Sequence, residues 1–195
     1  MAKAPPKQQA DLYYAPGSNI PFSGEARILH ENGNTYYEGQ FKDGYRVGIG
    51  VEWHSDGQVK YDGEWKEDKM HGHGTFFIED RSKFVGEFKE GSFYKGTLTH
   101  PDPYNEKFIG TFKDGHYGEG TLTYNGRKYE GTFEDGTFQG LGKLTFPDGR
   151  IFTGEFSYGS MRKGTMTFND GTKYVGEFYR DVDEFDELAS SLPNF

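Results

Sequence analysis

Two histidines separated by a single glycine form the stretch of this sequence that comes nearest to a metal site. His71-Gly72-His73 would place both imidazoles on one face of a strand, because side chains at positions i and i+2 of a strand point to the same side. A zinc site needs three or four protein ligands, and no third ligand can be named. Gly-x-Gly recurs along the chain with other residues at its centre, so the sequence predicts no metal and no other cofactor.

A pair of carboxylates, Asp62 and Glu64, is the second group that could do chemistry, as an acid and a base. Comparable acidic residues recur at regular intervals along the chain, which is typical of a solvent-facing strand surface. No glycine-rich loop carries the Lys-Ser or Lys-Thr of a phosphate site, and no serine lies in a nucleophile elbow. The chain contains no cysteine. We therefore predict that the protein is not an enzyme and has no catalytic residues.

The elements that carry these residues belong to a unit that recurs every 21 to 24 residues. Full copies span 37–60, 61–83, 84–107, 108–128, 129–151 and 152–173, and a half copy begins at Tyr174. The clearest copy starts with Tyr129, Gly131 and Phe133 at alternate positions, which predicts a strand with these residues on one face. Asp135-Gly136 then favours a tight turn, and a second strand follows. Each copy is therefore predicted to be one β-hairpin.

Short turns permit only antiparallel neighbours, so the predicted fold is all-β: an elongated, twisted, single-layer antiparallel meander of tandem hairpins. The spacing from the last aromatic of the first strand to the second glycine of the next strand is nine residues in three copies and eight in three others. Phe41 to Gly50 is an example of the longer spacing, and Phe112 to Gly120 of the shorter. One additional residue in a hairpin predicts a register shift or a β-bulge.

Three segments follow from this pattern. Residues 1–21 form a proline- and alanine-containing arm without periodicity, and such termini are disordered unless their own sheet or a partner holds them. Residues 22–178 form the repeat array, which begins with a half copy that we interpret as a cap. Residues 179–195 form an acidic tail with apolar residues at helical spacing, which predicts a short capping helix or, alternatively, a docking peptide.

Composition limits the classes of partner. The 22 basic and 31 acidic residues give a net charge of −9, which disfavours nucleic acid because phosphates are bound by basic side chains. Aromatic residues make up 17% of the chain, about half of the 33% that is hydrophobic, so the predicted core is thin and built of rings. The sequence shows neither a signal segment nor an apolar run of transmembrane length, and we expect a cytoplasmic protein.

The pattern Tyr-Glu-Gly-x-Phe-x-Asp-Gly-x-x-x-Gly-x-Gly, read from residue 129, resembles the MORN (membrane occupation and recognition nexus) repeat. The resemblance covers residues 22–178, and the copies that open with Phe84-Val85-Gly86 and Phe108-Ile109-Gly110 are more divergent. It implies a non-catalytic protein-protein interaction scaffold or adaptor. Similar proteins serve in cytoskeletal and ciliary or axonemal assemblies such as radial spokes, at membrane junctions and with myosin tails, so the implied location is the cytoskeleton or a cilium or flagellum.

The strand face that carries the aromatic residues is the predicted partner-binding surface, because no predicted helix is long enough to cover it. Most of its rings are expected to pack on one another and on glycines, and a stripe of rings that stays exposed would form the interface. It would bind a helix or an extended peptide of a cytoskeletal, axonemal or motor-associated protein. Phe112→Ala or Phe133→Ala would then weaken binding while the fold survives. Binding to phosphoinositides or anionic membranes is the alternative, and joining of the sheet ends in a homo-oligomer is a further expectation. The predicted partner-binding residues are Tyr61, Trp65, Phe84, Phe88, Phe108, Phe112, Tyr129, Phe133, Phe152 and Phe156.

Overall fold

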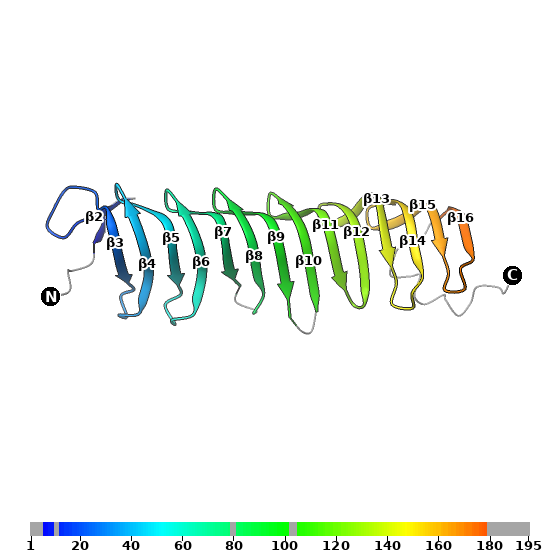
Figure 1. Ribbon diagram of the computed structural model, residues 1–195, viewed down its shortest axis with the longest axis horizontal. Helices are drawn as coiled ribbons and strands as arrows, with labels where there is room; N and C mark the ends of the chain where they lie inside the picture. Colours follow the sequence, from blue (N-terminus) through cyan, green and yellow to red (C-terminus); the bar gives the residue numbers. More distant parts are fainter. Residues whose placement is uncertain (1–5, 10–11, 79–80, 102–104, 179–195) are drawn as a thin grey trace. The chain divides into compact units, whose positions relative to one another are not determined.

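The computed structural model describes residues 6–9, 12–78, 81–101 and 105–178, and these residues form strands and turns with no helix. The chain divides into two compact units, Met1–Leu98 and Thr99–Phe195, which we describe separately. In both units the neighbours of a strand in the sheet are its neighbours in the sequence, and the strand pairs for which a register is resolved are antiparallel (Figure 1). The predicted all-β antiparallel meander of hairpins is confirmed.

The first unit contains two short strands followed by most of seven longer ones. They are β1 (Lys7–Gln9), β2 (Leu12–Tyr14), β3 (Gly24–Leu29), β4 (Thr35–Lys42), β5 (Tyr45–Trp53), β6 (Val59–Lys66), β7 (Lys69–Phe77), β8 (Lys83–Lys89) and β9 (Ser92–His100). The strands of the second unit are β10 (Glu106–Lys113), β11 (His116–Tyr124), β12 (Arg127–Glu134), β13 (Thr137–Thr145), β14 (Ile151–Ser157), β15 (Ser160–Thr167) and β16 (Lys173–Glu177).

The predicted Asp-Gly turns close the hairpins. Asp135 and Gly136 both have positive φ, of 48° and 74°, and Asp43 and Gly44 have values of 51° and 85°. Two successive positive φ values give the tight turn whose twist matches that of the flanking strands. Asp-Gly suits this turn because both residues tolerate left-handed backbone better than branched residues do.

Two spacings in the sequence produce two sizes of bulge. In β4–β5, Gly39 pairs with Gly50 and the next residue, Gln40, pairs with Val47, so two residues of β5 are extra. In β14–β15, Glu155 pairs with Lys163 and Phe156 with Met161, so one residue is extra. The first hairpin has the nine-residue spacing and the second has the eight-residue spacing. The predicted bulges are therefore confirmed, and each added residue lies in the bulge.

The larger bulge explains why some copies need glycine at the first position of Gly-x-Gly. Gly48, Gly72 and Gly140 have φ values of 63°, 52° and 69°, and all three lie in hairpins with the nine-residue spacing. Left-handed backbone at these positions favours glycine over any residue with a Cβ.

Neighbouring turns are joined by backbone hydrogen bonds. The Asp68 amide donates to the Arg46 carbonyl, the Gly91 amide to the Met70 carbonyl, and the Gly159 amide to the Phe138 carbonyl, at 2.9–3.1 Å. Among the described residues, no such bond joins the β12–β13 turn to the start of β11. A depression of about 380 Å³ lies at that place, between the β10–β11 and β12–β13 turns.

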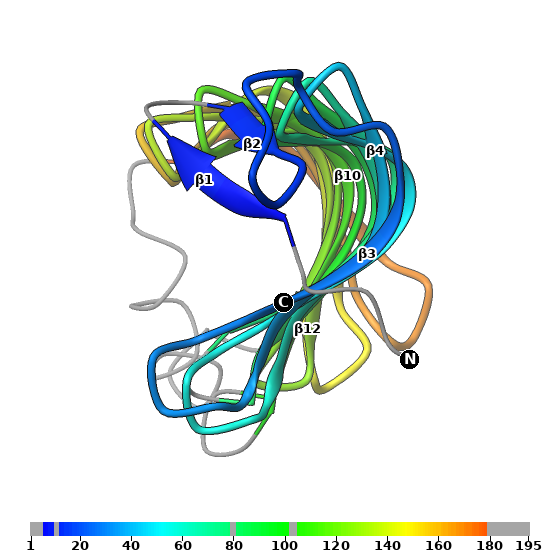
Figure 2. The same ribbon diagram turned by 90° about the vertical axis from the view of Figure 1, so that its left-hand side faces the viewer.

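Part of the N-terminal arm is held by its own sheet. The β1–β2 hairpin lies on the inner side of the curve formed by β3 and β4 (Figure 2). The Tyr13 amide donates to the Gly44 carbonyl at 3.0 Å, and the Tyr13 ring packs edge-on against Phe41, with ring centroids 5.0 Å apart. The predicted helix in residues 179–195 lies outside the described residues, as do Asp102 and Pro103, which follow β9.

We expect Gly140→Ala to lower the free energy of unfolding by about 1–2 kcal/mol, because that is the cost of left-handed backbone for a residue with a Cβ. Gly118→Ala is the matched control, since Gly118 holds the corresponding place in an eight-residue copy and lacks a positive φ. Its added methyl would lie 2.7 Å from Thr111 Oγ1 and 3.2 Å from the Thr111 carbonyl oxygen, so the Thr111 side chain must shift, and the loss measured for the control is the cost of that contact without left-handed backbone. Urea denaturation of both variants measures the difference, and equal losses would contradict this account of the bulge.

Candidate interaction surfaces

The predicted partner-binding residues form the core of the two units. All ten side chains lie on the inner face of the sheet and are only 0–7% exposed. Within a strand, the rings of Tyr129 and Phe133 meet edge to face, with centroids 5.1 Å apart. Between neighbouring copies, Tyr129 meets Phe156 in the same way at 5.0 Å. Each ring thus fills space for its own hairpin and for the next one.

Rings from the second strands cover this inner face, and the sequence analysis did not include them. Phe93 stacks on Phe84, Tyr117 on Phe108 and Phe138 on Tyr129, with centroids 3.9–4.2 Å apart. In each of these copies the ring stands shortly after the hairpin turn. This recurrence in the sequence could have predicted that they belong to the core.

Burial agrees with the expectation that rings pack on one another and on glycines, and it leaves none of the ten in an exposed stripe. Their contact with a partner stays a prediction, and it would require the sheet to open. Phe112→Ala and Phe133→Ala should therefore damage the fold first, contrary to the expectation from the sequence.

Burial also sets the chemistry of the tyrosines in the core. Tyr129 is fully buried, and its hydroxyl donates to the Thr132 carbonyl at 3.1 Å. Burial raises the pKa of Tyr129 to about 12 from the ordinary 10.0, because the phenolate would lose its hydration. The neutral hydroxyl is the form that the folded state favours.

The outer face of each unit carries isolated exposed apolar side chains among charged residues. Ile49 on β5 is 60% exposed and pairs with Glu64, while Leu141 on β13 is 74% exposed and pairs with Glu155. Val85, Ile109 and Val175 are also exposed on alternate positions of their strands. These five side chains lie on five different strands.

The candidates for catalysis and metal binding lie on this outer face. The His73 ring reaches towards two carboxylates, with Nδ1 3.6 Å from Glu64 Oε1 and Nε2 3.9 Å from Glu87 Oε1. A search of the described residues finds no group of three His, Cys, Asp or Glu side chains that could hold a metal. His73 is 77% exposed, and neither it nor Asp62 lines the depression at the β10–β11 and β12–β13 turns or the one between β3 and β4.

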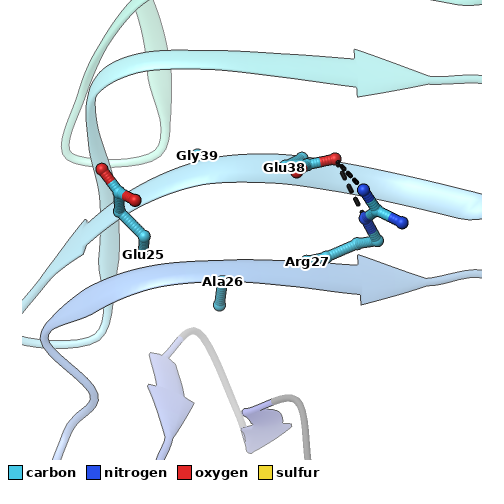
Figure 3. Close-up of a pocket in the computed structure, with 5 residues that line it drawn as sticks. All are labelled: Glu25, Ala26, Arg27, Glu38 and Gly39. Carbon is cyan, nitrogen blue, oxygen red and sulfur yellow. Dashed lines mark hydrogen bonds and ion pairs between the residues drawn. The ribbon is translucent and has the colours of Figure 1, made fainter. Parts of the chain in front are cut away.

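The outer surface has a second depression, of about 240 Å³, between β3 and β4 (Figure 3). Glu25, Ala26, Arg27, Glu38 and Gly39 line it, and Arg27 forms an ion pair with Glu38 at 2.9 Å. Both charged side chains are about half exposed, so the pair contributes little to stability. The depression is smaller than ordinary small-molecule sites, which are largely enclosed and apolar.

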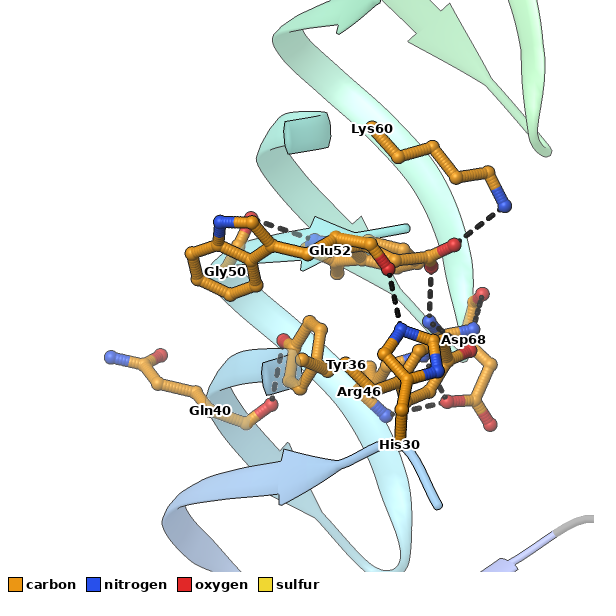
Figure 4. A network of polar contacts seen from close by, with 11 residues as sticks. His30, Tyr36, Gln40, Arg46, Gly50, Glu52, Lys60 and Asp68 are labelled. Carbon is orange, nitrogen blue, oxygen red and sulfur yellow. Dashed lines mark hydrogen bonds and ion pairs between the residues drawn. The ribbon is translucent and has the colours of Figure 1, made fainter. Parts of the chain in front are cut away.

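The first full copy differs from the others by a buried charged network (Figure 4). Arg46 Nη1 donates to Glu52 Oε2 at 2.7 Å, and Arg46 Nε donates to Asp68 Oδ1 at 3.0 Å. Lys60 Nζ donates to the other Glu52 oxygen at 2.6 Å. The Arg46 guanidinium also lies 4.1 Å from the Trp65 ring centroid, a cation-π distance.

This network occupies core positions that are apolar in other copies. Glu52 pairs with Tyr37, where the corresponding residues are Phe76, Leu122, Leu144 and Met166. Arg46 pairs with Phe41, where the corresponding residues are Met70, Tyr117, Phe138 and Met161. The sequence analysis missed the pair, although comparison of the copies could have found it. Since the charged groups already have partners, the network joins two hairpins and is not an open ligand site.

The fold defines a class of protein: a series of β-hairpins whose core consists of aromatic side chains packed on the inner face of the sheet. The family model for the MORN repeat matches residues 37–59, 61–82, 129–149 and 152–173. The chain therefore contains MORN repeats in these four segments. The matched segments lie on either side of residues 84–128, where the sequence is more divergent, and MORN repeats are generally modules for protein or membrane interaction. In the described parts of the chain, no helix has the length and apolar character needed to cross a bilayer.

We expect Phe133→Ala to lower the free energy of unfolding by about 3–5 kcal/mol, as is usual when a buried ring is removed. Leu141→Ala removes an exposed side chain nearby and should change stability by no more than about 0.5 kcal/mol. Thermal melts of the two variants test the assignment of rings to the core. A Phe133→Ala protein as stable as the parent would show that the ring is not required there.

Replacing both members of the Arg46–Glu52 pair should be tolerated better than replacing one. Glu52→Leu alone leaves a buried guanidinium with fewer partners, which typically costs about 3–5 kcal/mol. Arg46→Met with Glu52→Leu restores the apolar pattern of the other copies and should be neutral or stabilising by about 1–4 kcal/mol. Denaturant titrations of the single and double variants decide this, and additive losses would contradict it.

Alkaline pH should weaken the fold through its buried tyrosines. A phenol with a folded pKa of about 12 and an unfolded value near 10 stabilises the fold fully below pH 10. That contribution, up to roughly 2.7 kcal/mol for two pKa units, is lost as pH rises from 10 to 12. Tyr129→Phe should lose about 1 kcal/mol at neutral pH with its hydrogen bond, yet lose less than the parent between pH 10 and 12.

Phenylalanine is the matched replacement because Phe84, Phe108 and Phe152 occupy the same place in other copies. Denaturation midpoints at neutral and alkaline pH supply the measurement. Identical alkaline losses in parent and variant would assign the pH dependence to other groups.

Proposed function

We propose that this protein is a non-catalytic scaffold or adaptor that binds a protein partner within a cytoskeletal or ciliary assembly, in the cytoplasm. The observation that supports this proposal is the different exposure of the apolar side chains on the two faces of each unit. The inner rings are used within the fold, whereas the outer face presents exposed apolar side chains such as Ile49 and Leu141 among charged residues. Such a surface suits a protein partner whose apolar anchors are surrounded by polar contacts.

The repeat family supports the general role, since MORN repeats are interaction modules. The cytoskeletal or ciliary setting extends what the sequence resemblance implied and is the more specific part of the proposal. The net charge of −9 favours a protein partner over an anionic membrane, because membrane recruitment by electrostatics depends on clustered Lys and Arg.

The test is affinity capture with the full chain, followed by titration of each captured protein in purified form. We expect a saturable complex with a cytoskeletal or axonemal protein. Leu141→Glu should weaken that complex if the outer face of the second unit is used, while its thermal melt stays close to that of the parent. Lys143→Gln, two residues along the same face, serves as a polar control.

Vesicle flotation distinguishes binding to a protein partner from the alternative, binding to an anionic membrane. Vesicles with and without anionic lipid are mixed with the protein at low and moderate salt. Binding only to anionic vesicles, reversed by salt, together with no saturable protein partner, would overturn the scaffold proposal.

A further inference from the structure

β16 has the sequence of a first strand, and no second strand follows it among the described residues, which end at residue 178. Its Tyr174-Val175-Gly176 corresponds to Tyr129-Glu130-Gly131, which opens a hairpin. In the described part of the chain, β16 pairs only with β15. We propose that the edge of β16 at Tyr174–Gly176, which among the described residues pairs only with β15, binds an extended strand from a partner protein, and that this strand carries glycine followed two residues later by leucine or methionine. The inference rests on the proposed scaffold function and names one surface for it.

Tyr174 is the first observation that supports this site. The opening rings of all six full copies are completely buried, whereas Tyr174 is 50% exposed. In the preceding copies a second strand pairs with the strand of the opening ring, and in all of them but the first, where Arg46 stands, it places a ring or a methionine on the inner face. Phe138, for example, covers Tyr129 with centroids 3.9 Å apart. Tyr174 thus has the position of a core ring and the exposure of a surface ring.

Gly176 is the second observation. The Tyr174 ring already lies over Gly176, so that a Cβ added there would be 2.5 Å from the Tyr174 hydroxyl. In a complete hairpin the ring covers a pair of glycines: Tyr129 lies over Gly131 and also over Gly142 of the partner strand. In β16 the ring and the first glycine of this arrangement are present. Among the described residues, no second glycine faces Gly176 from the side opposite β15.

The register of the other hairpins specifies the incoming strand. In β12–β13, Gly131 faces Gly142 and Tyr129 faces Leu144. In β14–β15, Gly154 faces Gly164 and Phe152 faces Met166. A strand that completes β16 therefore places glycine opposite Gly176 and an aliphatic or methionine side chain opposite Tyr174. Main-chain hydrogen bonds would add affinity, as in other cases of strand addition.

The opposite kind of edge, at β3, is closed to such pairing. β3 has the register of a second strand, since Ile28 faces Tyr37 and Ala26 faces Gly39 (Figure 3). Other second strands have glycine at the Ala26 position, where an added Cβ would lie 2.7–2.8 Å from the covering ring, as at Gly142 and Gly164. The Ala26 methyl would therefore meet the ring of an incoming first strand.

Two rings also fill the space beside β3. Tyr13 and Phe22 pack edge-on against Phe41, with centroids 5.0 and 5.7 Å apart. Trp65, the residue that corresponds to Phe41, instead meets Tyr37 of the preceding copy at 5.4 Å. Tyr13 and Phe22 thus replace the missing ring. β3 of a second copy is consequently a poor occupant of the β16 edge, and residues 179–195 contain no glycine.

The experiment uses the full chain and a fluorescent peptide with the sequence of residues 137–147, which contains Gly142 and Leu144. Fluorescence anisotropy should report saturable binding. Gly142→Val in the peptide, and separately Gly176→Val or Tyr174→Ala in the protein, should each weaken it by at least about tenfold. Val175→Thr, on the outer face of the same strand, is the matched control and should bind like the parent. Thermal melts check that each variant is folded.

Several results would overturn the proposal: absence of saturable binding, equal binding of the Gly142→Val peptide, or unchanged binding by folded Gly176→Val protein. Binding that appears only after removal of residues 179–195 would assign the edge to the chain's own tail. Sedimentation showing a dimer that Gly176→Val dissociates would assign it to a second copy. If a captured partner binds the parent and the Gly176→Val protein equally, the scaffold function is supported and the β16 site is wrong. If neither protein captures a partner, the scaffold function is wrong as well.

Discussion

The contact of an aromatic ring with a pair of glycines across two strands is the constraint on which this fold depends. Tyr129 over Gly131 and Gly142 illustrates it, because a methyl group at either glycine would lie within 2.7 Å of the ring. The ring gains its burial from bare backbone, so a thin sheet can have a core without a second layer. The glycines lack side chains of their own, and their conformational freedom makes them costly in a strand unless a ring covers them.

Much of this architecture could be predicted from the sequence, because its signals are local. Alternation placed Tyr129 and Phe133 on one face, Asp135-Gly136 marked the turn, and the spacing to Gly142 anticipated the bulge. The exposure of the aromatic rings could not be predicted from this alternation, because a period of two shows which residues share a face of the sheet but not which side chains cover that face. Phe138 comes from the other strand of the hairpin, and its stacking on Tyr129 depends on the bulge that brings it there.

The buried charged pair could not be predicted from single residues for a related reason. Arg46 and Glu52 resemble solvent-facing residues when considered singly, yet they hold the places of Phe138 and Leu144 in another copy. A buried ion pair rarely adds stability over apolar residues, but it accepts only one arrangement of neighbours. The network with Asp68 and Lys60 therefore distinguishes the first hairpins from the rest of an otherwise similar series.

The missing turn-to-turn hydrogen bond in the second unit has a mechanical consequence. The β12–β13 turn is joined to the β10–β11 hairpin through the β11–β12 ladder, which runs from Glu119–Thr132 to Tyr124–Arg127, whereas the turns themselves are separated by the depression beside Lys113 and Asp135. A sheet joined along its strands but not at its turns bends most easily there. Bending at this point would widen the gap between the two turns, beside the rings of Tyr117 and Phe133, while the β11–β12 strands stay paired.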